Sequence, residues 1–109
     1  MASSTQYKIN AHTNGEIYEC DQAGFLFRNT DSTRFCLNRK ADFSYLKKKI
    51  ESKLRQPVSQ IFYQHPHFPD NNSVKFYQSH IQNDIEVQNM FRNHEYSGYD
   101  YIELYIVLQ

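Results

Sequence analysis

Two periods of apolar residues alternate along the chain, and their order predicts a mixed α+β fold. From Gln6 to His12, apolar and polar positions alternate, which is the period of a half-buried strand. From Asp42 to about Arg55 the apolar spacing changes to three and four, which predicts a helix with Asp42 as its N-cap, ended by Pro57. The cleanest alternation runs from Asp100 to Leu108 and predicts a final strand with apolar residues on both faces.

Further strands are predicted before the helix. Asn14-Gly15 is a typical hairpin turn, because both residues tolerate positive φ, so the segment 16–20 is expected to return as a strand. The short apolar stretch 24–27 is interpreted as part of an insertion or as a second short strand. Residues 33–38 alternate again and predict another strand.

After the helix, a second pair of strands is predicted over residues 59–64 and 73–77. Prolines, Asp and Asn between them predict a turn over residues 65–72. The remaining elements are a short helix capped by Asn83 or Asp84 and a last loop from His94 to Tyr99.

This order of elements is that of an α+β, ubiquitin-like β-grasp fold. We expect a mixed sheet of four to five strands packed on one long helix, plus one short helix, with the last strand in the middle of the sheet. A ferredoxin-like arrangement is the main alternative, but it has one strand before its first helix, whereas residues 6–38 offer at least two. A chain of 109 residues predicts a single domain, here residues 6–109 after a flexible segment 1–5.

Composition and charge restrict the classes of function that this chain can have. Twelve basic and twelve acidic residues give zero net charge, which disfavours nucleic-acid binding by this chain alone. No apolar run reaches the ~20 residues of a membrane span, and the first residues lack the apolar core of a secretory signal. Cys20 and Cys36 without CxxC spacing are interpreted as reduced thiols of an intracellular protein, nuclear or cytoplasmic.

No catalytic constellation is recognisable. The chain has no Gly-rich phosphate loop, no Ser-His-Asp arrangement and no carboxylate pair with a reason to be buried. His65, His67 and His80 lack Cys or carboxylate partners at ligand spacing, so they are interpreted as polar rings rather than metal ligands. We therefore expect neither enzymatic activity nor a metal or cofactor.

Three segments follow a recognisable pattern in one order: IFYQHP over 61–66, QNDIEVQNMF over 82–91 and YIELYI over 101–106. They resemble the motifs I-x-Y-R-x-P, DDEDVRxMF and IELYV of the N-terminal domain of plant MuDR/Mutator-like transposases. The resemblance extends over essentially the whole chain. It implies a non-catalytic Phox/Bem-type interaction domain, from a transposase or a domesticated derivative, whose partner is a second copy or a related ubiquitin-like domain.

Phox/Bem-type domains pair front to back, the basic face of one on the acidic face of the next. The resemblance implies that Lys8 takes the position of the first-strand lysine. At the acidic motif the chain reads Gln82-Asn83-Asp84-Ile85-Glu86, with fewer carboxylates than the family. The candidate basic face comprises Lys8, Lys47 and Lys48, and the candidate acidic face comprises Asp84, Glu86 and the more distant Asp70.

Each charged candidate also has a simpler explanation. Lys8 is more simply explained as a solvated residue than as an interface cation, because isolated surface charges are common and exposed ion pairs contribute only about 0–1 kcal/mol. Asp84 and Glu86 lie at a helix start, where carboxylates interact favourably with the helix dipole. The lysine-rich helix is either a solvated face or a phosphate-binding face, and the second reading leaves an accessory nucleic-acid-binding domain as the alternative function.

Tyr101 and Tyr105 are expected on the sheet face away from the helix. An aromatic patch of this size needs a cover. Either the segment 15–32 or a protein partner supplies it, and the sequence leaves both open. The function predicted from the sequence is protein–protein interaction, including oligomerisation.

Overall fold

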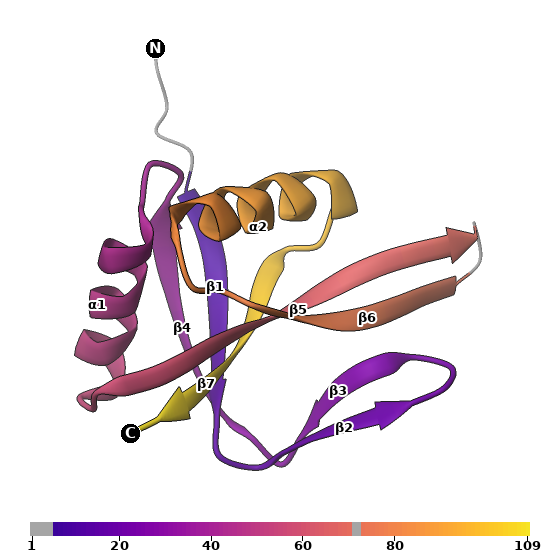
Figure 1. Ribbon diagram of the computed structural model, residues 1–109, viewed down its shortest axis with the longest axis horizontal. Coiled ribbons are helices and arrows are strands. Elements are labelled where there is room, and N and C mark those ends of the chain that lie inside the picture. The colour runs from indigo at the N-terminus through magenta and orange to yellow at the C-terminus, as the bar shows by residue number, and fades with distance from the viewer. Residues whose placement is uncertain (1–5, 71–72) are drawn as a thin grey trace.

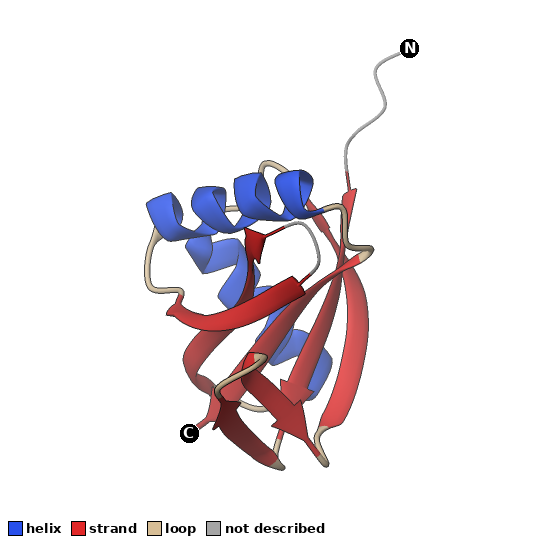
Figure 2. Ribbon diagram, turned by 90° about the vertical axis from the view of Figure 1, so that its right-hand side faces the viewer, coloured by secondary structure: helices blue, strands red, loops and turns tan. Residues whose placement is uncertain are grey.

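The computed structural model describes residues 6–70 and 73–109, and its strands form one mixed sheet (Figures 1 and 2). The strand order is β2-β3-β6-β5-β7-β1-β4. The segment 1–5, expected to be flexible, lies outside the described residues. The strands are β1 (Gln6–Thr13), β2 (Glu16–Cys20), β3 (Gly24–Arg28), β4 (Asp31–Asn38), β5 (Val58–Asp70), β6 (Ser73–His80) and β7 (Tyr101–Leu108), and the helices are α1 (Phe43–Leu54) and α2 (Asp84–Ser97).

The centre of the sheet has the β-grasp arrangement. β1 is antiparallel to β4 along its whole length, and β7 runs parallel to β1 on its other side. β7 is also antiparallel to β5, so the last strand lies in the middle of the sheet. The predicted fold class is therefore confirmed, with seven strands in the sheet instead of four to five.

The additional strands come partly from a hairpin inserted between β1 and β4. Asn14 and Gly15 have the expected positive φ of 61° and 66°, but β2 does not pair with β1. It pairs with β3, so the prediction that residues 16–20 return along the first strand is wrong, whereas residues 24–27 lie in a short strand, one of the two interpretations that the sequence left open. The reason is burial: no side chain of β2 is fully buried, whereas β4 supplies Phe35 and Leu37 to the core.

The two helices begin where the sequence predicts but differ in length from the prediction. Asp42 caps α1 by accepting from the N–H of Tyr45 at 2.8 Å, and Asn83 caps α2 by accepting from the N–H of Glu86 at 2.9 Å. α2 has 14 residues and α1 has 12, so the prediction of a short second helix followed by a loop from His94 is wrong. The buried stripe of α2 continues to His94, which keeps the chain helical up to Gly98.

β5 is longer than predicted. It continues through Pro66 to Asp70, where the sequence predicts a turn; residues 71 and 72 of that turn lie outside the described residues. Pairing of β5 with β7 ends at Tyr63, so Pro66 has a strand neighbour on its β6 side alone within the described chain. The N–H that Pro66 lacks therefore breaks no hydrogen-bond ladder on the side of β5 that faces β7. Residues 64–70 and 73–78 form an arm, the β5–β6 arm, that extends beyond the core (Figure 1).

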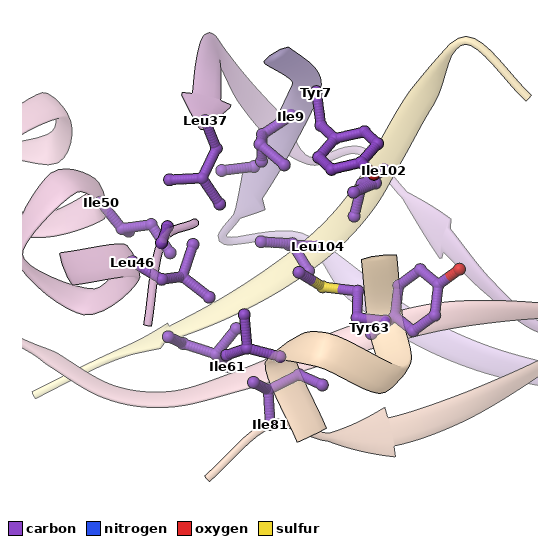
Figure 3. Packing of buried hydrophobic residues seen from close by; sticks show 14 of the residues in the cluster. Tyr7, Ile9, Leu37, Leu46, Ile50, Ile61, Tyr63, Ile81, Ile102 and Leu104 are labelled. Atoms are coloured by element: carbon purple, nitrogen blue, oxygen red, sulfur yellow. The ribbon is translucent and has the colours of Figure 1, made fainter. Parts of the chain in front are cut away.

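One hydrophobic core lies between the helices and the inner face of the sheet. Figure 3 shows side chains of α1 and of β1, β4, β5 and β7 directed toward one another. None of the described helices has the length and apolar content needed to cross a membrane. The largest fully buried side chains are Ile9, Leu37, Leu46, Ile50, Val58, Ile61, Val87, Met90, Phe91, Ile102, Leu104 and Ile106.

Candidate interaction surfaces

Two cations gather around one tyrosine on the outer face of the sheet, the face away from the helices. Lys8 and Tyr101 are register partners on β1 and β7, and Arg34 extends from the neighbouring β4. Lys8 Nζ lies 5.7 Å and Arg34 Cζ 5.1 Å from the centroid of the Tyr101 ring, within the range of cation–π attraction. We call Lys8, Arg34 and Tyr101 the basic surface.

The two cations of the basic surface are exposed, and neither forms an ion pair with a carboxylate of the described chain. The sequence assigned Lys8 and Tyr101 to separate surfaces and did not single out Arg34. The alternation of residues 33–38 puts Arg34 on the outer face, but its place near Tyr101 depends on the order β7-β1-β4.

A polar network adjoins the basic surface. The Glu103 carboxylate accepts from Asn10 Nδ2 at 3.0 Å and lies 2.6 Å from His12 Nε2. The other ring nitrogen of His12 lies 2.7 Å from the Thr30 hydroxyl. The buried Oδ1 of Asn10 has no hydrogen-bond partner within the described residues. These contacts hold the Glu103 carboxylate in place beside the central strands.

The inserted hairpin covers Tyr105. The Phe27 ring lies 5.4 Å from the Tyr105 ring and 5.0 Å from the His12 ring, centroid to centroid. The Tyr105 hydroxyl donates to the Asn14 carbonyl at 3.0 Å. Tyr105 is thus covered from within the chain, whereas Tyr101 on the same face is flanked by the Lys8 and Arg34 side chains.

The candidate acidic residues lie apart and take part in local structure. Asp84 accepts from the N–H of Phe43 at 2.8 Å, and Glu86 accepts from the N–H of Gln82 at 2.7 Å. Asp70 lies on the β5–β6 arm, far from the start of α2 (Figure 1), and accepts from the Ser73 hydroxyl at 3.1 Å. Asp84 and Glu86 therefore share the first turn of α2, where their sequence spacing already places them, and Asp70 lies on a different element.

The candidate lysines of the helix are not part of the basic surface. Lys47 and Lys48 lie on α1, which packs Leu46 and Ile50 against the inner face of the sheet. Lys8 points from the opposite, outer face. The three lysines proposed as one basic face are therefore divided between the two sides of the sheet.

The histidines of the arm belong to an aromatic and polar network. The Tyr63 hydroxyl donates to Asn93 Oδ1 at 2.8 Å, and Asn93 Nδ2 lies 2.7 Å from His65 Nε2. Burial raises the pKa of Tyr63, while burial and the neighbouring His67 lower the pKa of His65. No group of three or more His, Cys, Asp or Glu side chains within residues 6–70 and 73–109 could hold a metal ion.

Comparison with known proteins adds a structural likeness. No family model and no curated protein matches the sequence. The solution structure of the PB1 domain of Cdc24p (long form) covers 92% of this chain, which in turn covers 96% of that one, with 15% identity and a TM-score of 0.54. A likeness at this identity shows the fold alone. It does not test the resemblance to Mutator-like transposases. The chain therefore has the ubiquitin-like fold of a PB1 domain.

Proposed function

We propose that this chain is a protein-interaction domain that binds an acidic segment of its partner through the basic surface. The observation that carries the proposal is the pair Lys8 and Arg34, exposed beside Tyr101 without a carboxylate partner in the described chain. Tyrosine and arginine are enriched in protein interfaces, where a ring supplies area and a guanidinium binds carboxylates.

The proposed partner is a related ubiquitin-like domain with a more acidic segment than this chain has. Asp84 and Glu86 already accept backbone hydrogen bonds, and the segment Gln82–Glu86 carries just these two carboxylates. A second copy of the chain therefore offers weaker complementarity. We therefore favour a related domain over a second copy as the partner, and the test below can detect self-association.

The test uses synthetic peptides and ¹⁵N-labelled protein. A peptide containing Asp-Asp-Glu-Asp should shift the amide signals around Lys8, Arg34 and Tyr101, and an Asn-Asn-Gln-Asn peptide should not. Arg34→Gln and Lys8→Gln should each weaken binding, and rising salt should weaken it further. Lys48→Gln removes the same charge from α1 and serves as the matched control.

Equal losses from Lys48→Gln and Arg34→Gln would overturn the proposal, because the binding would then follow net charge. Light scattering during size-exclusion chromatography, over a wide concentration range and at two salt concentrations, tests the second copy as partner. A dimer that dissociates at high salt would establish self-association. A monomer throughout would exclude it.

We also propose that the domain belongs to a Mutator-like transposase or a domesticated derivative and acts in the nucleus. The proposal rests on the resemblance of the segments 61–66, 82–91 and 101–106. Sequencing the genomic region around the coding sequence tests it. Transposase-derived coding sequence or terminal inverted repeats should adjoin it, and an unrelated gene context would contradict the proposal.

A further inference from the structure

The sheet opens between β5 and β7, and a cleft of about 300 Å³ lies at the opening. The last pair that joins the two strands is Tyr63 with Leu104. Beyond this pair β5 continues along β6, while the segment 101–103 of β7 continues along β1. Two strand edges thus diverge, and each lacks a strand neighbour on the cleft side within the described residues.

Aromatic rings and carboxylates line the cleft. Its walls include the rings of Phe76, Tyr99 and Tyr101, and two carboxylates, Asp100 and Glu103, lie among the lining residues. Asp100 is exposed, and the side chain of Glu103 is 31% exposed. Rings with their negative faces and nearby carboxylates form a suitable environment for a cationic group.

The lining residues supply no cation of their own. Lys and Arg are absent from the lining. His94 also lines the cleft, and burial lowers its pKa although Glu95 and Asp100 act in the opposite direction. The Glu103 carboxylate is held by His12 and Asn10, so Asp100 is the carboxylate of the lining that forms no ion pair within the described residues.

Tyr101 belongs both to the basic surface and to the wall of this cleft. In the strand order β6-β5-β7-β1-β4, Lys8 and Arg34 lie on the β1 and β4 side of Tyr101, and the cleft lies on its β5 side. The two neighbouring areas therefore have opposite charge. They suit different segments of a partner.

We propose that the cleft binds an arginine or lysine side chain carried by an extended segment of a protein partner. An extended segment fits because strand edges at 101–103 and 64–67 border the cleft, and added strands are held by such edges. A segment fits better than a free small ion because the aromatic surface continues past the cleft. Phe68 and Tyr99, 44% and 42% exposed, stack there with ring centroids 6.4 Å apart.

The inference goes beyond the proposed function, because it requires neither Lys8 nor Arg34. The probes are four pentapeptides with identical flanking residues and a central arginine, lysine, citrulline or norleucine. Citrulline keeps the shape of arginine without its charge. The arginine and lysine peptides should shift the amide signals of Gln64 and residues 99–103 of the ¹⁵N-labelled protein, with binding about tenfold tighter than for citrulline or norleucine.

Variants of exposed residues locate the binding. Asp100→Asn and Tyr99→Ala should each weaken the arginine peptide about tenfold. Asp21→Asn removes an exposed carboxylate at the β2–β3 turn and should have no effect. Arg34→Gln should not weaken binding either, which separates this site from the basic surface. Thermal unfolding confirms that each variant is folded.

Three results would overturn the inference. Equal affinity for the arginine and citrulline peptides would show that the cleft does not recognise the charge of the side chain. Unchanged binding in Asp100→Asn would place the cation elsewhere. Absence of saturable binding for the arginine and lysine peptides would show that the cleft takes no such side chain, whatever the outcome for the acidic peptide at Lys8 and Arg34.

Discussion

The backbone N–H of Phe43 donates to Oδ1 of Asp84 at 2.8 Å, so the first turn of α2 satisfies a free donor in the first turn of α1. Asp84→Ala should lower the free energy of unfolding by about 0.5–2 kcal/mol, as does the loss of other side-chain acceptors at helix starts. Asp84→Asn keeps an acceptor oxygen and should cost less. Urea denaturation measures both, and equal losses would show that the charge matters rather than the hydrogen bond.

Gly24 joins the inserted hairpin to β6. Its φ is +81°, and a Cβ built there would lie 2.0 Å from the Phe76 carbonyl oxygen. Gly24→Ala should destabilise the protein by ~1–3 kcal/mol and should detach β3 from β6. Hydrogen exchange of the Phe76 amide, which donates to the Ala23 carbonyl at 2.7 Å, should accelerate. Gly98→Ala is the comparison, since nothing lies within 4 Å of its Cβ position although its φ is also positive.

His65 and His94 should make the free energy of unfolding depend on pH. Burial lowers the pKa of both. Below about pH 6.5 the unfolded chain therefore binds more protons than the folded one, and the free energy of unfolding should fall as the pH decreases from that value. His65→Gln combined with His94→Asn should flatten this dependence. An unchanged slope in the double variant would contradict the prediction.

Tyr7 should affect stability at alkaline pH. Burial, followed by a hydrogen bond to Glu95, raises its pKa from 10.0 to about 12. The folded protein keeps this proton longer than the unfolded chain, so Tyr7 should make the free energy of unfolding fall as the pH rises from 10 to 12. Tyr7→Phe should remove this contribution. In Glu95→Gln, ultraviolet titration should still find a raised pKa, because burial is the largest cause.

The sequence predicts the core of the fold because each core element carries its own period. Phe35 and Leu37 alternate on β4, and Leu46 and Ile50 are one helical turn apart on α1. The end of α2 is different. His94 has a polar side chain, yet it is only 8% exposed. A search for periodic apolar residues does not detect a buried histidine, so it ends the helix too early.

The surfaces depend on neighbours that the sequence does not specify. The alternation of β7 puts Tyr101 and Tyr105 on one face, but the strand order decides that Arg34 lies over the first and Phe27 over the second. Asp84 and Glu86 resemble an acidic motif by spacing. Their backbone partners show that the same carboxylates also stabilise the helix starts.

The inserted hairpin has a consequence for how copies of this protein meet in concentrated solution. Without it, β6 would expose its backbone donors and acceptors along an outermost strand that carries Phe76 and Tyr77. Gly24 and Ala23 occupy part of that edge. The outermost strands are now β2, with Glu16 and Glu19, and β4, with Asp31 and Arg34. Charged edge strands discourage edge-to-edge association, so the inserted hairpin replaces an aromatic edge of the sheet by one that carries Glu16 and Glu19.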